Sequence, residues 1–585
     1  MSGFQFGPEL TPSGVNYRLW APAAKTVELL MDRPLAMQAA DGAWYSLHIP
    51  DAGGGARYKF RINGALEVPD PASAFQPEDV SGPSEVVDHE SYRWAARDWR
   101  GRPWHETAIQ ELHVGAFTPS GTFRAAVDKL DHVVAAGFTA IELMPIADFA
   151  GRRNWGYDGV LFYAPDSAYG RPDDLKAMID AAHQRGLMVF LDVVYNHFGP
   201  EGNYLAAYAP QFFTAARTPW GSAIDYRVPA VRAFAIQNAL HWIDRYRFDG
   251  LRLDAVHAIS APGTPHLLED LSRAVGRYAE QHGRYVHLML ENDNNCAGLL
   301  DPRTDPPRGR YRAQWNDDYH HAWHVLLTGE RHGYYVDYAH APFRQIARVL
   351  ACGFAYQGET SVHRKARRGE PSNTLPPDAF VNFLQNHDQI GNRPFGDRLT
   401  TQADARALEA ALAITLLAPM PPLMFMGEEW GSIRPFPFFC DFTGDLAEAV
   451  RKGRREEFKA AYTRSGDKVP DPLLEETFRS AVLDWDARFS SAGKARLDLV
   501  TRLFEVRQRE IVPRIPDATF GNARVNGSVL EAEWNPAGGG KLRLVANLGE
   551  TAAKFSDDVS GKPIWGGPQP PSLPPYAVFW SVGAS

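Results

Sequence analysis

The sequence contains few cysteines. Cys296, Cys352 and Cys440 are its only three among 585 residues. Three scattered thiols are too few for a disulfide framework or a cysteine-rich zinc site, and they are typical of a reducing compartment. The first ten residues, MSGFQFGPEL, also lack the basic segment and apolar core of a signal peptide. We therefore expect a cytoplasmic protein.

Long uninterrupted hydrophobic runs are scarce as well. The longest, residues 411–426, is interrupted by Pro419, Pro421 and Pro422, so it predicts the end of a helix followed by a buried strand and not a membrane span. An excess of positive charge is also missing. The formal net charge is -9 and the pI is near 6.1, which argues against nucleic acid or an anionic membrane as the main partner.

What is present is the composition of an ordinary globular protein, with 44% hydrophobic and 22% charged residues. Residues 1–90 contain short alternating segments separated by Gly and Asp turns, which predict an N-terminal β-sandwich. The predicted strands are residues 15–21, 26–31, 44–49 and 57–64. Trp20 and Trp44 in this region could bind a sugar ring, but packing in the core is the favoured interpretation.

Residues 91–515 alternate apolar strands with helical patterns, which predicts a parallel sheet covered by helices on both faces. One of the predicted helices carries Ala126, Leu130, Val133 and Val134 on its buried stripe and ends at Gly137. The predicted strands are residues 109–114, 139–146, 187–197, 250–256, 285–291, 312–316, 379–385 and 422–427. Eight such units predict an α/β fold, a (β/α)8 TIM barrel, closed by a helix over residues 495–510.

Residues 516–585 predict a C-terminal all-β domain. Its apolar alternating segments are residues 529–534, 541–548 and 576–582.

Polar residues follow the apolar strands of the predicted barrel, at the carboxyl ends where TIM barrels carry their active sites. They are Asp192, Asn196 and His197 on the third strand, Arg252, Asp254 and His257 on the fourth, Glu291 on the fifth, and Asn386, His387 and Asp388 on the seventh. In the fourth strand the alternation places Arg252 and Asp254 on one face, where the arginine can keep the carboxylate ionised. Taken alone, this pair is interpreted equally well as a buried structural ion pair.

Two carboxyl groups that converge from neighbouring strands suit retaining glycoside hydrolysis, in which one is an ionised nucleophile and the other a protonated acid, about 5 to 5.5 Å apart. The same residue types could hold a divalent cation. We rank a metal site lower, because Arg252 would repel the cation. No metal-ligand cluster stands out, so we expect neither a metal nor another cofactor.

Four motifs of the chain, LDVVYNH, GLRLDAVH, LMLEN and LQNHD, resemble the four conserved regions of the α-amylase family of glycoside hydrolases, in the same order. The resemblance implies that Asp254 is the nucleophile, Glu291 the general acid/base and Asp388 a third carboxylate that holds sugar hydroxyls. Asp192 would have a structural role at the barrel end.

The resemblance also implies a set of substrate-binding residues. Tyr157 would supply a stacking platform, and Arg252 would orient Asp254. The whole set is Tyr157, His197, Arg252, His257, Asn316, Asp317, Asp318, His320, Asn386, His387 and Gln389. For residues 316–320 the alternative is a loop whose Asn and Asp side chains cap the end of a barrel strand.

Within the α-amylase family, a β-sandwich before the barrel narrows the choice to branching enzymes, debranching enzymes and the trehalohydrolases that act on maltooligosyl trehalose. The stretches YRLWAPAAKTVEL, ELHVGAFTPSGTF, GRRNWGYDGV, YNHFGPEGNYL and QWNDDYHH resemble the last group. That resemblance implies hydrolysis of the α-1,4 bond next to a terminal trehalose, and a functional link to a maltooligosyl trehalose synthase. Two alternatives remain open: an α-glucan branching enzyme, and a glucan-binding protein without activity. Nothing in the sequence indicates an oligomeric state.

Overall fold

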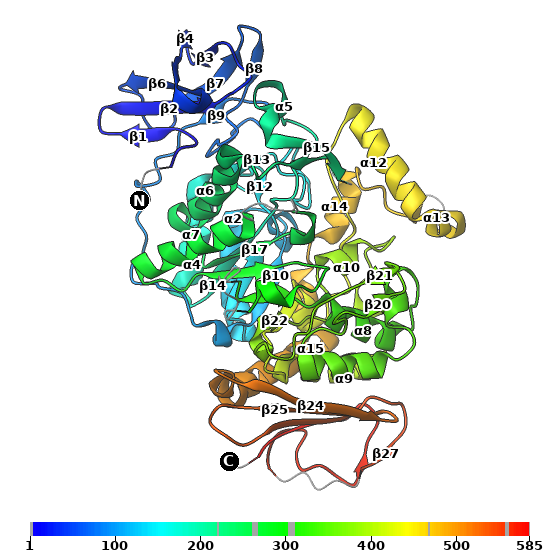
Figure 1. The fold of residues 1–585 in the computed structure, drawn as a ribbon. Coiled ribbons are helices and arrows are strands. Elements are labelled where there is room, and N and C mark those ends of the chain that lie inside the picture. Colours follow the sequence, from blue (N-terminus) through cyan, green and yellow to red (C-terminus); the bar gives the residue numbers. More distant parts are fainter. Residues whose placement is uncertain are drawn as a thin grey trace.

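The computed structural model describes residues 4–218, 221–259, 267–301, 311–465, 468–555 and 561–583. A β-sandwich at the N-terminal end, a central barrel and a C-terminal β domain follow one another along the molecule (Figure 1). In the ranges just given, no helix is both long enough and apolar enough to cross a lipid bilayer.

The barrel confirms the predicted fold class. Eight parallel strands of the described chain neighbour one another in chain order, and the ring is closed by a parallel bridge between Asn382 and Pro422. The strands are β10 (Ile109–Leu112), β11 (Ala140–Leu143), β14 (Met188–Val193), β17 (Gly250–Leu253), β18 (His287–Leu290), β19 (Ala313–Trp315), β22 (Phe380–Val381) and β23 (Leu423–Phe425). Each lies within its predicted range, although the strands are shorter than the apolar runs that predicted them.

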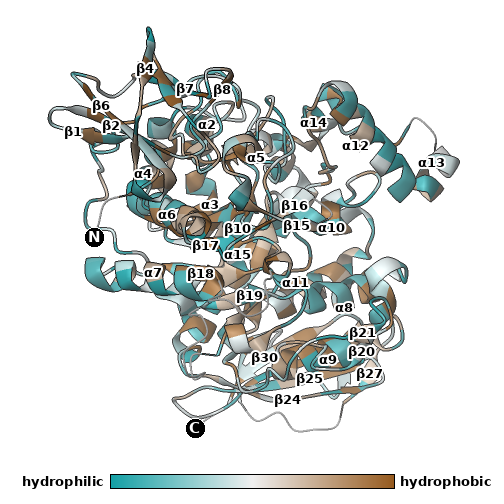
Figure 2. Cartoon of the chain, turned by 45° about the horizontal axis from the view of Figure 1, so that its top comes forward, coloured by the Kyte–Doolittle hydropathy of each residue, from teal (hydrophilic) through white to brown (hydrophobic). Residues whose placement is uncertain are grey.

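Helices surround this sheet. The longer ones are α4 (Pro172–Gln184), α6 (Pro229–Arg245), α7 (Leu267–His282), α8 (Asp317–Thr328), α9 (Pro342–Cys352), α11 (Ala405–Leu417) and α15 (Ser491–Val506). Figure 2 shows hydrophobic residues gathered around the barrel strands, whereas α7, on the outside, is mostly hydrophilic. On α4 the buried residues include the apolar stripe Leu175, Met178, Ile179 and Ala182.

One predicted helix is wrong in part. Residues 123–136 form two helices, α2 (Phe123–Val127) and α3 (Leu130–Ala136), and the regular helix is interrupted at Asp128 and Lys129. Leu130 and Val133 are buried, but Val134 is 40% exposed. The next residue along a helix lies about 100° around its axis, so Val134 leaves the buried stripe. Gly137 ends α3 as predicted, with φ 108°.

The pairing register of the barrel strands divides the barrel interior into two layers of side chains. The amino-terminal half is filled by apolar side chains such as Ile109, Met188 and Met289. In the carboxyl-terminal half the pairing places Glu111 beside Glu142, and Asp192 beside Arg252. The apolar layer therefore supports a polar layer directly beneath the mouth of the barrel.

The N-terminal β-sandwich packs on the outside of the barrel. Its two sheets are built mainly from β2 (Gly14–Trp20), β3 (Val27–Leu30), β6 (Trp44–Pro50) and β7 (Arg57–Ile62). Trp20 is 8% exposed and its ring lies 5.7 Å from that of Phe212, while Phe6 meets Phe234 of α6 at 5.1 Å. Trp20 therefore packs in the core, which was the favoured interpretation of the sequence.

The C-terminal domain is a five-stranded antiparallel sheet in the described part of the chain, with a further strand pair beside it. Its order is β24 (Thr519–Asn526), β25 (Val529–Asn535), β26 (Leu542–Asn547), β30 (Val578–Val582) and β28 (Lys562–Trp565). Trp534 and Trp580 stack in its core at 5.5 Å. Strand β24 was not predicted, because its side chains alternate between exposed and half-buried and few of them are apolar. It packs against α9 of the barrel domain.

A buried arginine joins the closing helix α15 to the barrel. After Val506 the helix continues as a π-helical turn, residues 507–511, which begins with Arg507. The Arg507 guanidinium donates to the carbonyl oxygens of Leu416, Ala418 and Met420 at 2.5 to 3.0 Å. These carbonyls end α11 and lead into β23, so Arg507 satisfies acceptors that the helix end leaves free.

We predict that Arg507→Met lowers the free energy of unfolding by about 2–4 kcal/mol, because methionine fills the space but leaves three buried carbonyls without donors. Arg509, two residues along and 64% exposed, provides the matched control: Arg509→Met should change stability by no more than about 0.5 kcal/mol. The measurement is urea denaturation followed by circular dichroism. Equal effects of the two substitutions would show that the buried hydrogen bonds contribute nothing.

Candidate active site

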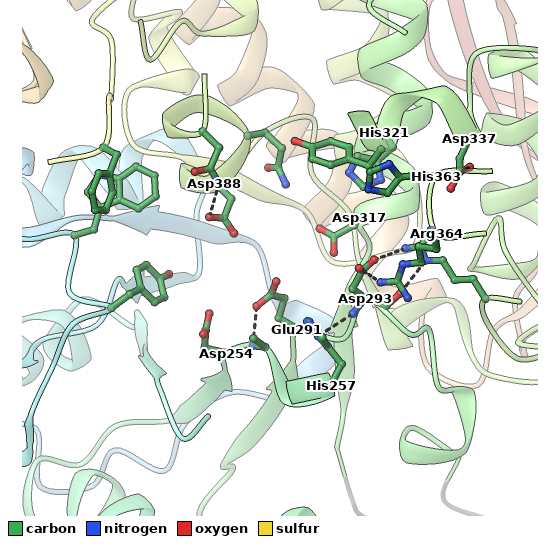
Figure 3. A pocket seen from close by; sticks show the side chains of 18 of the residues that line it. Asp254, His257, Glu291, Asp293, Asp317, His321, Asp337, His363, Arg364 and Asp388 are labelled. Carbon is green, nitrogen blue, oxygen red and sulfur yellow. Dashed lines mark hydrogen bonds and ion pairs between the residues drawn. The ribbon is translucent and has the colours of Figure 1, made fainter. Parts of the chain in front are cut away.

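A cavity of about 740 Å³ opens at the carboxyl ends of the barrel strands. Figure 3 shows carboxylates from several elements pointing into it, with Asp254 and Glu291 on one wall and Asp388 across from them. The residues that line it include Asp254, His257, Glu291, Asp293, Asp317, His321, Asp337, His363, Arg364 and Asp388. The strand-end residues that the sequence singled out for catalysis therefore converge on one cavity.

The fully buried Arg252 holds three carboxylates. Its Nη1 donates to Asp192 at 2.6 Å and to Asp254 Oδ1 at 2.8 Å, and its Nη2 lies 3.0 Å from Glu291 Oε2. Asn196 donates to the second oxygen of Asp254 at 3.2 Å. Asp254 thus accepts from a cation and from an amide, and both interactions favour its ionised form.

The backbone also holds Glu291, at the same oxygen that Arg252 contacts. Directly after Asp254 the chain turns sharply at Ala255, which has a left-handed conformation with φ 40° and ψ 48°. This turn aims the Ala255 N–H at Glu291 Oε2, 2.8 Å away. A non-glycine residue in this region is strained by about 1–3 kcal/mol, and such strain is often found at functional sites.

The protonation of the pair follows from these contacts. Burial raises the pKa of Asp254, and the charge of Arg252 opposes that rise. Burial also raises the pKa of Glu291; Arg252 opposes this, while the negative charge of Asp254 adds to it. Since Asp254 has the better donors, it is the member that stays ionised, and Glu291 is the member suited to carry a proton.

Asp388 and His387 stand at the start of the short helix α10 (His387–Gly391). Asn386 caps this helix, and its side chain accepts from the Asp388 N–H at 2.9 Å. Burial raises the pKa of Asp388, while the neighbouring His387 opposes the rise. His387 itself is 1% exposed and lies beneath the cavity wall, with its ring stacked on Tyr157 at 5.1 Å.

Tyr157 is placed by a glycine. At Gly156 φ is 107°, and a Cβ there would lie 2.0 Å from the carbonyl oxygen of Pro145, so only glycine lets the loop pack this closely. The Tyr157 hydroxyl donates to Asp192 at 2.6 Å, and its backbone carbonyl lies 2.9 Å from His197 Nε2. Tyr157 and His197 both line the cavity, as do His257, Asp317 and Gln389.

Six predicted substrate-binding residues do not line the cavity, and Asn316, Asp318 and His320 are three of them. Asn316 donates to Gly353 and Asn382, His320 faces the carbonyl of Leu384, and Asp318 pairs with Arg368 and accepts from backbone amides. All three are fully buried. For these residues the contacts favour the alternative of side chains that cap the end of a barrel strand, and direct binding of the substrate stays a prediction. Asn386 and Arg252 are likewise buried beneath the cavity, where they support other residues.

Several cavity residues were missed. Tyr334, Asp337, His363, Arg364 and Arg368 belong to the insertion between β19 and β22, where no strand or helix period relates them to the barrel. Asp293 follows Glu291 by two residues and forms ion pairs with Arg364 and Arg368. Its place after a barrel strand was a usable signal. In the described part of the chain no group of His, Cys, Asp and Glu side chains could hold a metal ion.

The raised pKa of Glu291 predicts the alkaline limb of the pH profile. A carboxyl with a raised pKa keeps its proton to a higher pH, so activity should fall as the pH rises through that value. Glu291→Gln should lower kcat by about 10²–10⁴-fold, and its residual activity should lack this limb. The measurement is kcat against pH for both proteins.

Asp317 provides the control for that profile. Burial and the charge of Glu291 raise the pKa of Asp317 to about 8, so it could also produce an alkaline limb. Asp317→Asn should leave the limb in place. A limb that disappears in Asp317→Asn but persists in Glu291→Gln would transfer the acid role to Asp317.

Family models match all three parts of the chain. Residues 98–210 match the alpha amylase catalytic domain, and residues 3–73 match carbohydrate-binding module 48, the isoamylase N-terminal domain. Residues 518–580 match a domain of unknown function, DUF3459. Among solved structures, a protein from Salmonella typhimurium described as an alpha amylase is 44% identical, with a TM-score of 0.93 over 99% of both chains. A pullulanase from Paenibacillus barengoltzii, 18% identical with a TM-score of 0.74 over 100% of this chain and 96% of its own, shares the fold.

Curated relatives are similar over most of the chain. The malto-oligosyltrehalose trehalohydrolase of Deinococcus radiodurans is 40% identical over 92% of this chain and 88% of its own. The enzyme of the same name from Saccharolobus solfataricus is 39% identical over 82% of this chain and 83% of its own. A 1,4-alpha-glucan branching enzyme from Mycobacterium ulcerans is 34% identical over 72% of this chain but only 59% of its own. The chain therefore belongs to the malto-oligosyltrehalose trehalohydrolases, within the α-amylase family of glycoside hydrolases.

Proposed function

We propose that this protein hydrolyses the α-1,4-glucosidic bond next to the terminal trehalose of a maltooligosyl trehalose, and releases trehalose and a maltooligosaccharide. The observation that carries the proposal is the pair Asp254 and Glu291 on one buried guanidinium, at the wall of a cavity large enough for several sugar rings. The trehalohydrolase relatives support the choice of substrate.

The carboxyl groups have different roles in this reaction. Asp254 attacks the anomeric carbon and forms a covalent glycosyl-enzyme, while Glu291 gives its proton to the departing oxygen. Glu291, now ionised, takes a proton from water, and that water cleaves the glycosyl-enzyme and frees Asp254. Two displacements at one carbon retain its configuration. Asp388 lies across the cavity, where it can hold hydroxyls of the sugar as positive charge develops.

The positions of Asp254 and Glu291 also orient the substrate. The leaving group departs on the side of the acid, which is the side of His257, Asp293, Asp317 and Arg364 (Figure 3). We call these four residues the leaving-group side. Asp317, whose pKa is raised to about 8 by burial, is protonated at neutral pH and can donate a hydrogen bond to a sugar hydroxyl. The trehalose unit is expected to bind here.

A branching enzyme is the second candidate, and the relative from Mycobacterium ulcerans is the observation that favours it. Transfer uses the same Asp254 and Glu291, and differs in that a sugar hydroxyl instead of water attacks the glycosyl-enzyme. The product experiment below separates the two.

The substrate requires a supplier. A reaction that builds an α,α-linked glucose pair at the reducing end of a maltooligosaccharide must precede this one, and we propose that a maltooligosyl trehalose synthase performs it. Free Cys296 and Cys352 at half-buried positions, with Cys440 buried, support a reducing compartment such as the cytoplasm for this protein.

Asp254→Asn is predicted to lower turnover on the order of 10³-fold or more while glucan binding stays measurable, because the amide keeps the shape of the carboxylate but cannot attack the sugar. Turnover is measured by chromatography and binding by calorimetry. Asp498→Asn, on the exposed side of α15, is the control and should match the parent. Unchanged turnover in Asp254→Asn would rule out the nucleophile assignment.

Product analysis tests the substrate. The protein is incubated separately with maltopentaosyl trehalose and with a linear maltooligosaccharide of equal length. We expect free trehalose from the first and much slower cleavage of the second. New α-1,6 linkages would indicate a branching enzyme, and equal cleavage of both substrates would contradict specificity for trehalose.

A further inference from the structure

Glu111 is a buried carboxylate next to the active site that has no part in the reaction described above. It lies at the carboxyl end of β10 and is 1% exposed. Both of its carboxyl oxygens contact His387: Oε2 accepts from the His387 backbone N–H at 3.1 Å, and Oε1 lies 2.5 Å from the ring Nδ1. One carboxylate therefore holds both the backbone and the ring of this histidine.

The other ring nitrogen of His387 also faces a carboxylate. Its Nε2 lies 3.5 Å from Asp388 Oδ1, on the side of the cavity. Ionised carboxylates accept hydrogen bonds and do not donate them, so a histidine between two of them carries a proton on both nitrogens. The ring is also stacked on Tyr157, and aromatic faces attract cations.

The other charged groups around His387 do not reverse this conclusion. Arg252 is the nearby cation, but it is already paired with Asp192 and Asp254. The groups that face His387 from the packed elements are Glu111 on β10, Glu142 on β11, Asp192 on β14, Arg252 on β17, His113 and Asp388.

Burial favours the neutral form of two of these groups. Burial raises the pKa of Glu142 well above its usual range, and burial lowers the pKa of His113 to about 4. Burial alone would lower the pKa of His387 too, but the negative charges of Glu111 and Asp388 raise it to about 9.

We propose that Glu111 is a positioning residue that keeps His387 as an imidazolium cation, so that its Nε2–H stays a donor towards Asp388, which lines the cavity. The role of Asp388 towards the sugar rests on the proposed function, whereas the charge of His387 does not. Glu111 touches no substrate and acts only through His387. Without its charge, His387 would lose the Nδ1 proton at neutral pH, and the Nε2 donor would weaken.

Glu111→Gln removes the charge and keeps the shape. The glutamine oxygen can still accept from the backbone N–H of His387, while its amide nitrogen faces Nδ1. The first measurement is the pH titration of His387 in the unliganded protein, by NMR of histidine labelled with ¹³C at Cε1. The signal is assigned by its loss in His387→Gln. We expect the parent titration midpoint near pH 9, and a midpoint at least two pH units lower in Glu111→Gln.

The kinetic readout separates charge from structure. In Glu111→Gln, kcat should fall about 10-fold or more at pH 8 and recover as the pH is lowered, whereas KM changes little. Glu111→Asp keeps the charge and should retain the pH dependence of the parent. Glu142→Gln is the matched control in the same sheet: because burial raises the pKa of Glu142 and so favours its neutral form, this variant should keep the parent profile.

Two outcomes would overturn the proposal. The first is a midpoint below pH 7 for His387 in the parent protein. This measurement needs no variant, so the proposal can still be tested if Glu111→Gln fails to fold. The second is a titration midpoint of His387 that is the same in folded Glu111→Gln as in the parent protein. Because the titration uses no substrate, a failure of the trehalohydrolase assignment shows up in the product analysis and leaves the titration result unaffected.

Discussion

The active site depends on the one guanidinium of Arg252. It is fully buried, lies 4.1 Å from the ring centre of Trp315 and bridges Asp192, Asp254 and Glu291. Without this cation, carboxyl groups so close together in a buried place would repel one another and take up protons. The arginine thus lets an ionised and a protonated carboxyl stand side by side. Arg252 also sets the directions of these two carboxyl groups, because Asp254 contacts Nη1 and Glu291 contacts Nη2 of a rigid planar guanidinium.

The barrel makes this arrangement possible through its two layers. The apolar half of the interior excludes water and fixes the strands. The pairing register of neighbouring strands then places their polar residues side by side in the other half. The flanking domains stabilise the shell around it: the N-terminal sandwich packs on α6 and the C-terminal sheet on α9. Arg507 ties α15 to the end of α11 and so helps to hold the last strand in the ring.

The neighbours of each titratable group in this site determine whether its ionised or its protonated form is favoured. Asp254 has a cation and an amide, Glu291 shares the same cation and accepts from a backbone N–H, and Asp317 is buried near the charge of Glu291. His387 lies between two carboxylates. A proton on Glu291 suits a reaction in which the departing oxygen must be protonated as the bond to the sugar breaks.

Strand periods and residues at strand ends are local patterns, so the fold class and the candidate carboxyl groups could be predicted from the sequence, and the family resemblance supplied their expected roles. Asp254, Glu291 and Asp388 each follow an apolar strand, and the barrel must bring such ends together. Tertiary structure alone decided which neighbours face the cavity. Asp317 lines it while Asp318, the next residue on α8, turns inward to Arg368. Helix rotation separates such neighbours, and the insertion that carries Arg368 has no period that relates it to the barrel, so only packing could place them.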